Sequence, residues 1–428
     1  MKFSQIPQVL QKQMKFLHFL FYSVLGKYST FIFDIIVIHK LSKSDFGKYS
    51  LILLVANFAF TFGFNWHSSV LLFIGTKEKA KREKFNHTLH AKNIISLIAS
   101  LVILGIFIFK GKSVTNYVGI NLNYHILLYI FSKVFSDYMR QYFFSIQKQN
   151  TAQIMVIVSR VVLITLALIF SINLGNLLIL MSFTEFLSFI FIYKINKNDI
   201  LPIETNWKSI KQVFNFSFWQ LFGFTGLYII NFGDLAVIKH YLTIEDVAVY
   251  NAAYKIFFGV AGLSYAIINF YASEVSTNLN NKNYKQVSEF YRKDRMKILA
   301  IIIPGVILLI LSSKWIIPIL CGKQYGQSAG IFAVLMVGAI FQFASSFYTI
   351  YFNTEKKYKI LQTVNVSRAV LNILLDILLL KYFGIYGPAI ATVIAISSAF
   401  LFLFLYSENK IKQYRYLDEK NSIPITKS

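Results

Sequence analysis

The chain has 428 residues, of which 56% are hydrophobic and only 14% are charged, and its mean hydropathy is +0.55. A soluble domain carries about 25% charged residues, so this composition excludes an ordinary soluble protein and favours one whose apolar surface faces lipid. The formal net charge of +24 would indicate nucleic-acid binding in a soluble protein, but in a membrane protein the positions of the charges decide its meaning.

Long apolar segments recur along the whole chain. About 20 mostly apolar residues are needed to cross the hydrocarbon core of a bilayer, so each segment of this kind predicts a transmembrane helix. The predicted spans are residues 17–38, 49–74, 92–110, 123–145, 153–172, 176–194, 212–238, 248–273, 296–319, 328–352, 359–380 and 385–407. We therefore expect an all-α polytopic membrane protein with about twelve transmembrane helices.

Basic residues gather in alternate connections between these spans. With the N-terminus inside, the inner segments hold about 28 Lys and Arg and the outer loops about 8, which is the asymmetry that orients membrane helices. The dense stretches are Lys77–Lys92, Lys194–Lys211, Lys282–Lys297 and the tail from Lys410. We expect both termini to be cytoplasmic, and contact with anionic membrane lipid explains these stretches without nucleic acid as a partner.

Two passages repeat at an offset near 200 residues. Residues 33–50 (FDIIVIHKLSKSDFGKYS) match residues 233–251 (GDLAVIKHYLTIEDVAVYN), and a V-S-R-x-V run surrounds both Arg160 and Arg368. Six spans per half is an even number, so the halves would be related by an axis along the membrane normal, with a cavity between them. Rocking of the halves then exposes the cavity to each side in turn.

This duplication predicts the domain organisation. We expect an N-terminal six-helix bundle over residues 1–200, a C-terminal six-helix bundle over residues 201–410 and a cytoplasmic tail over residues 411–428.

Four passages resemble a known family. They are HKLSKSDFGKYSLILL, DLAVIKHYLTIEDVAVYNAAYKI, ILCGKQYGQSAGIFAVLMVGAIFQ and KYFGIYGPAIATVIA. The chain resembles the polysaccharide transporter family of O-antigen and related repeat-unit flippases, within the superfamily that also contains the multidrug and toxic-compound extruders (MATE). One departure is that the first half has only Leu174, Gly175 and Asn176 where a counterpart of the G-I-Y-G-x-A run would lie.

The resemblance implies a MATE-like fold and a flippase. Its substrate would be undecaprenyl pyrophosphate bearing an oligosaccharide repeat unit of O-antigen, and hence of lipopolysaccharide, or of another surface polysaccharide. The protein would move this lipid from the cytoplasmic to the outer leaflet of the bacterial inner membrane, alongside other polysaccharide-assembly proteins.

Basic side chains inside the predicted spans indicate the substrate pathway. A Lys or Arg at the bilayer centre costs about 2.5–3.5 kcal/mol, so most of these side chains must face protein or water. A cavity lined by such cations attracts a pyrophosphate, which Arg binds in a bidentate manner and Lys binds as a point charge. The candidate substrate-binding residues are Lys27, Lys133, Arg140, Arg160, Lys255 and Arg368.

Structural roles compete with substrate binding for several of these groups. Arg140 and Lys255 would snorkel if they lie near an interface. Lys133, Asp137 and Arg140 share one stripe of a predicted helix and can neutralise one another. Both interpretations stay open at the level of sequence.

Carboxylates within the spans are candidates for energy coupling. A buried carboxylate can bind H⁺ or Na⁺ and change its charge as the site opens. The alternative is a cap or a pair with a neighbouring lysine such as Lys27 or Lys239. The candidate residues are Asp34, Asp137, Asp234 and Asp376. No cofactor or metal site is expected, and Cys321, the single cysteine, excludes a cysteine cluster.

Three other functions fit the sequence less well. A MATE-like extruder of drugs or metabolites would favour an apolar or acidic cavity, whereas the charges within these spans include many cations. A membrane glycosyltransferase commonly holds a metal ion through paired carboxylates, but the sequence has no Asp-x-Asp. A polysaccharide polymerase would favour a large outer loop, and the predicted outer loops have about 15 residues or fewer. We therefore expect a transporter and not an enzyme.

Overall fold

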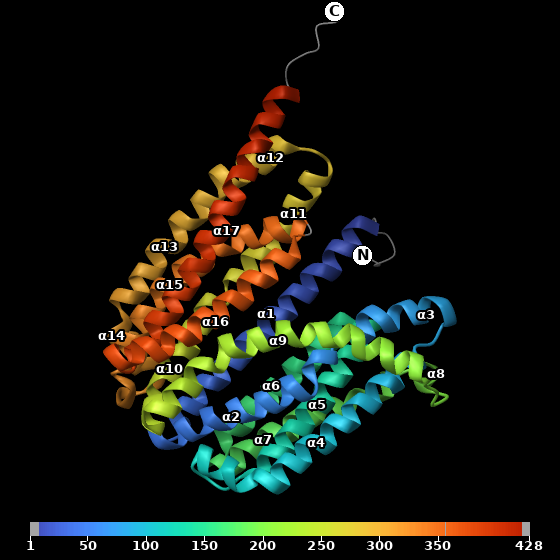
Figure 1. Cartoon of the computed structure of the whole chain (residues 1–428), viewed down its shortest axis with the longest axis vertical. Helices are drawn as coiled ribbons and strands as arrows, with labels where there is room; N and C mark the ends of the chain where they lie inside the picture. Colours follow the sequence, from blue (N-terminus) through green and yellow to red (C-terminus); the bar gives the residue numbers. More distant parts are fainter. Residues whose placement is uncertain (1–7, 356, 422–428) are drawn as a thin grey trace, which may run out of the picture. The chain divides into compact units, whose positions relative to one another are not determined.

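The computed structural model describes residues 8–355 and 357–421, and all regular secondary structure in this part is helical (Figure 1). The helices are α1 (Gln8–Lys40), α2 (Lys43–Gly63), α3 (Thr76–Arg82), α4 (Asn86–Val118), α5 (Asn123–Ser145), α6 (Gln149–Ile169), α7 (Leu174–Phe186), α8 (Lys197–Ile200), α9 (Trp207–Tyr241), α10 (Ile244–Ala261), α11 (Ser264–Asn280), α12 (Tyr284–Glu289), α13 (Arg295–Leu311), α14 (Ser313–Cys321), α15 (Ser328–Thr354), α16 (Tyr358–Phe383) and α17 (Tyr386–Asn421). The predicted all-α class is confirmed.

Nine helical segments of the described chain are long and apolar enough to cross a membrane. A tenth span forms if residues Tyr284–Leu311 and Ser313–Cys321, which meet at 74°, count as one. The two remaining predicted spans coincide with α5, which carries three charged residues along its length, and with α10 followed by α11. The protein is thus a multi-pass membrane protein, and about twelve helices match the predicted spans.

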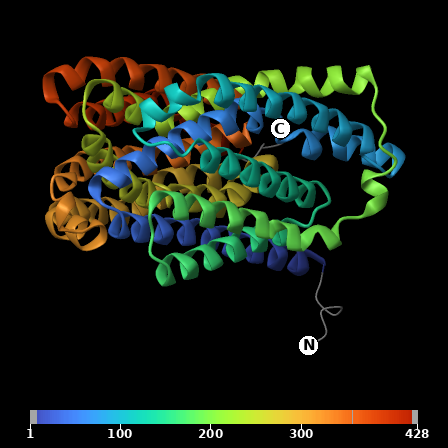
Figure 2. The same ribbon diagram turned by 90° about the horizontal axis from the view of Figure 1, so that it is seen from below.

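The chain divides into two compact units, Met1–Tyr228 and Ile229–Ser428, and the division falls inside α9. In the first unit, α1 packs on α6, α5 packs on α6 and α7, and α2 packs on α4 and α5. An extended connection, residues 201–206, joins α8 to α9 in this unit (Figure 2). In the second unit, α15 lies against α10, α11, α13 and α17, and α16 lies against α17. The bundle boundaries expected from the duplication stay a prediction.

The two passages matched by the repeat have the same local structure. Ser42 precedes α2 and accepts a hydrogen bond from the backbone N–H of Asp45 at 3.1 Å. Thr243 precedes α10 and accepts the equivalent bond from Asp246 at 3.2 Å. A Ser or Thr at the N-cap satisfies an N–H group that the first helical turn leaves unpaired. The S-x-x-D and T-x-x-D runs therefore mark where a new helix begins after a tight turn.

The predicted span 49–74 is wrong in its second half. α2 ends at Gly63, and the chain continues through a 3₁₀ turn, Asn65–His67, and a π-helical turn, Leu71–Gly75. The indole N–H of Trp66 donates to the carbonyl of Gly63 at 3.1 Å and so satisfies an acceptor that the ended helix leaves free. Hydropathy alone does not register this break, because the residues on both sides of it are apolar.

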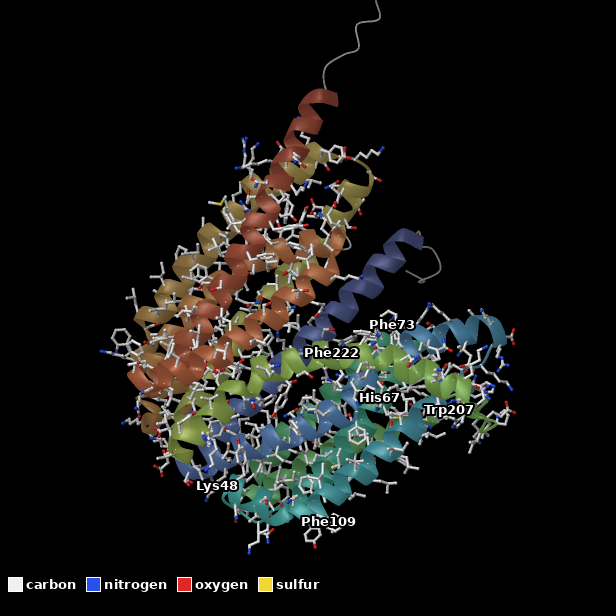
Figure 3. All side chains as sticks on the ribbon, viewed as in Figure 1. Lys48, His67, Phe73, Phe109, Trp207 and Phe222 are labelled. Carbon is white, nitrogen blue, oxygen red and sulfur yellow. The ribbon has the colours of Figure 1, made fainter. Side chains whose placement is uncertain are left out.

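Large apolar side chains remain exposed on the outer faces of the helices. Phe109 on α4 is 84% exposed and Trp207 at the start of α9 is 76% exposed, and Figure 3 shows both pointing outward. Apolar surface on this scale is unfavourable in water but suits a lipid environment, and tryptophan favours the membrane interface.

Candidate functional site

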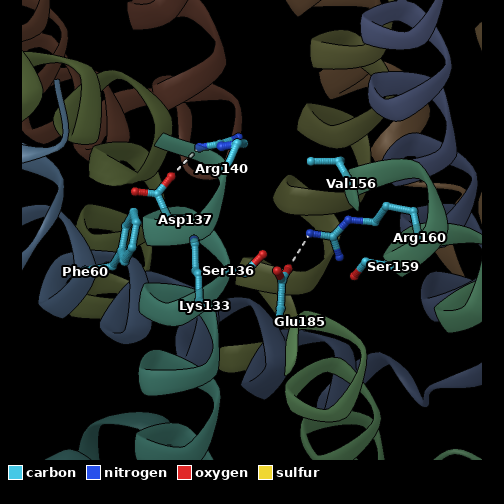
Figure 4. A pocket seen from close by; sticks show the side chains of 9 residues that line it. All are labelled: Phe60, Lys133, Ser136, Asp137, Arg140, Val156, Ser159, Arg160 and Glu185. Atoms are coloured by element: carbon cyan, nitrogen blue, oxygen red, sulfur yellow. Dashed lines mark hydrogen bonds and ion pairs between the residues drawn. The ribbon is translucent and has the colours of Figure 1, made fainter. Parts of the chain in front are cut away.

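A small cavity lies inside the first unit, between α2, α5, α6 and α7 (Figure 4). Its volume is about 120 Å³, and its lining residues are Phe60, Lys133, Ser136, Asp137, Arg140, Val156, Ser159, Arg160 and Glu185. Each of the four residues from α5 lies three or four positions from two of the others, which places all four on one face of the helix. Lys133, Arg140 and Arg160, three of the six predicted cationic residues, are therefore brought together.

Two of these cations are paired with carboxylates in the cavity. Arg160 on α6 donates to Glu185 Oε1 on α7 at 2.8 Å, and Arg140 donates to Asp137 Oδ1 one turn away on α5. The Arg140–Asp137 pair follows from their spacing of three residues. The partner of Arg160 comes from another helix, and sequence spacing does not reveal it.

Lys133 has no carboxylate partner in the described part of the chain. Its ammonium donates to Asn57 Oδ1 at 2.6 Å and lies 4.6 Å from the ring centre of Phe60. The possible pairing with Asp137 does not form, because Arg140 and Gln141 donate to the two oxygens of Asp137. With three cations and two carboxylates in its lining, the cavity has one surplus positive charge.

The other three predicted cations lie away from this cavity. Lys27 is on α1 with its side chain exposed, and Lys255 is half-buried on α10 of the second unit. Arg368 is half-buried on α16, and its guanidinium donates to Gln342 Oε1 at 3.4 Å. Within the described residues Arg368 forms no ion pair.

A second polar cluster is buried in the other unit. Asn372 on α16 donates to Asp234 Oδ1 at 2.6 Å and to Asp376 Oδ2 at 3.0 Å, so one amide joins two carboxyl groups. Thr392 Oγ1 and Tyr250 Oη also donate to Asp234, the threonine at 2.9 Å. The exposed fractions of Asp234 and Asp376 are 4% and 0%. Four helices, α9, α10, α16 and α17, supply these residues.

One oxygen in this cluster lacks a partner. Asp376 Oδ1 is buried, and no described residue donates a hydrogen bond to it. The other groups of the cluster are neutral hydroxyl and amide groups, so nothing in it offsets the charge of two buried carboxylates. A shared proton or a bound monovalent cation would each lower the cost of burying these like charges. Asp234 and Asp376 were predicted from the sequence, whereas Asn372, Tyr250 and Thr392 were not. The four-residue spacing of Asn372 and Asp376 on one helix face was the available signal.

The remaining acidic candidates differ from this pair. Asp137 is held by Arg140 and Gln141, and Asp34 is 9% exposed on α1. Groups of three or more His, Cys, Asp or Glu side chains that could hold a metal ion do not occur among the described residues.

Solved transporter structures share this fold. A lipid II flippase MurJ in an inward closed conformation aligns with a TM-score of 0.73 at 17% identity, covering 92% of this chain and 89% of that chain. An inward-facing multidrug resistance transporter of the MATE family aligns with a TM-score of 0.68 at 16% identity, covering 91% and 96%. The predicted MATE-like fold is thus confirmed.

Curated relatives match part of the sequence. The uncharacterized membrane protein MJ1068 of Methanocaldococcus jannaschii is 26% identical over 221 residues, 50% of this chain and 42% of that protein. The probable low-salt glycan biosynthesis flippase Agl15 of Haloferax volcanii is 22% identical over 190 residues, 44% of this chain and 40% of that protein. The matched region thus spans less than half the length of either relative.

The profile of a family described as "Polysaccharide biosynthesis protein" matches residues 40–330, which is more than half of the chain. This match includes the capped turn before α2, the whole lining of the cavity and the passage around Asp234. The chain therefore belongs to the polysaccharide biosynthesis protein family.

Proposed function

We propose that the protein is a flippase for undecaprenyl-pyrophosphate-linked oligosaccharide repeat units. It moves the lipid from the cytoplasmic to the outer leaflet of a bacterial inner membrane by alternating access, with both termini cytoplasmic. The repeat unit belongs to O-antigen or another surface polysaccharide. The observation that carries this proposal is the cavity of the first unit with its surplus positive charge.

The cavity suits a phosphate group of the lipid headgroup. Lys133 supplies a compact charge that no described carboxylate neutralises, and Arg160 and Arg140 supply planar N–H donors. A volume of about 120 Å³ is well below the roughly 300–1,000 Å³ of pockets for drug-sized ligands. The cavity therefore binds phosphate, and the sugars lie outside it.

The two buried carboxyl groups of the second unit serve energy coupling in this proposal. Their burial, at 4% and 0% exposure, suits a bare H⁺ or Na⁺ better than an organic cation of a drug. The free Oδ1 of Asp376 provides the ligand oxygen. A MATE-like extruder of drugs or metabolites is the second candidate function, and the fold shared with MATE transporters is the observation that favours it.

Replacement of single cavity residues tests the proposal. Lys133→Met or Arg160→Ala should abolish surface polysaccharide in a host that lacks its own flippase, while the amount of folded protein in the membrane stays normal. Lys110→Met on the exposed face of α4 is the matched control and should support normal polysaccharide. Normal surface polysaccharide in both cavity variants would refute the assignment, and resistance to cationic drugs conferred by the wild type would favour the extruder.

A further inference from the structure

Lys92 is a buried lysine next to the cavity. It lies near the start of α4 with an exposed fraction of only 2%. Its ammonium donates to Gln141 Oε1 and lies 4.8 Å from the ring centre of Tyr138, both on α5. Lys92 is the last residue of the predicted basic stretch Lys77–Lys92 and the first of the predicted span 92–110, and its burial was not predicted.

A chain of hydrogen bonds connects Lys92 to the cavity. Gln141 Nε2 donates to Asp137 Oδ2, and Asp137 Oδ1 accepts from Arg140. An ammonium can only donate, so Lys92 fixes the amide of Gln141 with its oxygen toward the lysine and its nitrogen toward Asp137. Asp137 thus accepts a hydrogen bond from Gln141 at Oδ2 and one from Arg140 at Oδ1.

The charge of Lys92 is not neutralised locally. No carboxylate lies within ion-pair distance of its ammonium in the part of the chain that the structure describes, and burying an unpaired charge is costly. The cavity lining has one surplus positive charge, on Lys133. Lys92, two hydrogen bonds behind the lining, adds a second.

We propose that Lys92 is a positioning residue that matches the charge of the site to a diphosphate headgroup. This inference rests on the proposed function. A diphosphate diester carries about two negative charges near pH 7 and a phosphate diester about one. Two surplus ammonium groups, at Lys133 and Lys92, neutralise the first of these headgroups and leave excess charge with the second. The site therefore selects lipids linked through diphosphate over lipids linked through monophosphate.

Two synthetic probes that differ in this charge test the inference. Farnesyl diphosphoryl glucose and farnesyl phosphoryl glucose are titrated against the full-length protein in lipid nanodiscs. The wild type should prefer the diphosphate probe by roughly tenfold. Lys92→Met and Lys92→Gln should reduce that preference by roughly fivefold or more, because both remove the charge, and the glutamine keeps a donor for Gln141. Lys92→Arg should restore the preference, and Lys110→Met on the same helix should leave it at the wild-type value.

The outcomes separate this inference from the proposed function. Binding of neither probe by the wild type would count against the proposed function itself. Equal affinity of the wild type for the two probes would overturn the role of Lys92. An equal loss of affinity for both probes in the folded Lys92 variants would do the same. Neither result would contradict the flippase assignment. If the Lys92 variants fail to fold, the ratio of the wild-type affinities for the two probes still tests whether the site selects diphosphate.

Discussion

Arg160 on α6 and Glu185 on the next helix, α7, are joined inside the cavity, where the guanidinium donates to the carboxylate at 2.8 Å. Both side chains are largely buried, with exposed fractions of 18% and 9%. Glu185 thereby takes the place on Arg160 that a phosphate oxygen of the proposed substrate would occupy. The pair avoids an isolated buried charge when substrate is absent, and it makes the carboxylate a competitor of phosphate.

Glu185→Gln should tighten the binding of the diphosphate probe and slow its transport. Glutamine keeps an oxygen that can accept from Arg160 but removes the negative charge that competes with phosphate. We expect Kd to fall by about threefold to tenfold, with a lower rate of release. Titration in nanodiscs measures Kd, and movement of a fluorescent lipid-linked sugar across reconstituted vesicles measures the rate.

Glu289→Gln is the matched control, since Glu289 pairs with Lys293 at 3.2 Å and its side chain is 47% exposed. This variant should change neither quantity. If Glu185→Gln folds normally and binds the probe more weakly than the wild type, the carboxylate supports binding, and competition is the wrong description.

Asp376→Asn should uncouple transport from the cation gradient without weakening the binding of the probe. Asparagine keeps the size of the side chain and an oxygen that can accept from Asn372, but it removes the charge that a cation neutralises. A ligand that binds only the folded state raises its stability, so the coupling cation should raise the unfolding temperature of the wild type more than that of the variant. Thermal unfolding with and without Na⁺, at several pH values, measures this difference.

Asp294→Asn provides the comparison, because Asp294 is 50% exposed and pairs with Lys297 on the surface of the same unit. Its response to Na⁺ and to pH should equal that of the wild type. An Asp376→Asn protein that keeps full cation dependence of both stability and transport would exclude this cluster as the coupling site.

Sequence periodicity predicts the part of the cavity that one helix supplies. Lys133, Asp137 and Arg140 lie three and four residues apart on α5, so a common face follows from helical geometry alone. Which carboxylate each cation binds depends on tertiary packing. The partner of Arg160, Glu185, lies on α7. Asp137 Oδ2 accepts from Gln141 on α5 and not from Lys133.

The carboxylate cluster also depends on contacts between helices that are far apart in the sequence, and sequence patterns do not predict such contacts. Asp234, Tyr250 and Thr392 belong to passages that resemble the polysaccharide transporter family, yet only the folded chain brings them to one point. The burial of Lys92 was not predicted because a lysine at the edge of an apolar segment has the same sequence signature whether it faces water or protein. Most of the membrane spans were predictable because hydropathy depends on composition and not on which partner each helix packs against.

The G-I-Y-G run contains a glycine at a close approach of backbone segments. A Cβ added at Gly387, near the start of α17, would lie 2.4 Å from the backbone nitrogen of Leu380 and 2.5 Å from the carbonyl carbon of Leu379 on α16. Gly384 ends α16 with a φ of 55°, which turns the chain back so that the two helices meet here. Backbone atoms cannot move aside as the end of a flexible side chain can.

Gly387→Ala should therefore destabilise the protein by about 1–3 kcal/mol or more, the cost of overpacking. Gly305→Ala on α13 is the matched control, because a Cβ there meets nothing within 4 Å. Alanine in a helix is favoured over glycine by up to about 1 kcal/mol, so this control should be neutral or stabilising. Unfolding temperatures of the purified proteins in detergent compare the two. Equal unfolding temperatures for Gly387→Ala and the wild type would mean that α16 and α17 lie farther apart at this turn than the structure places them.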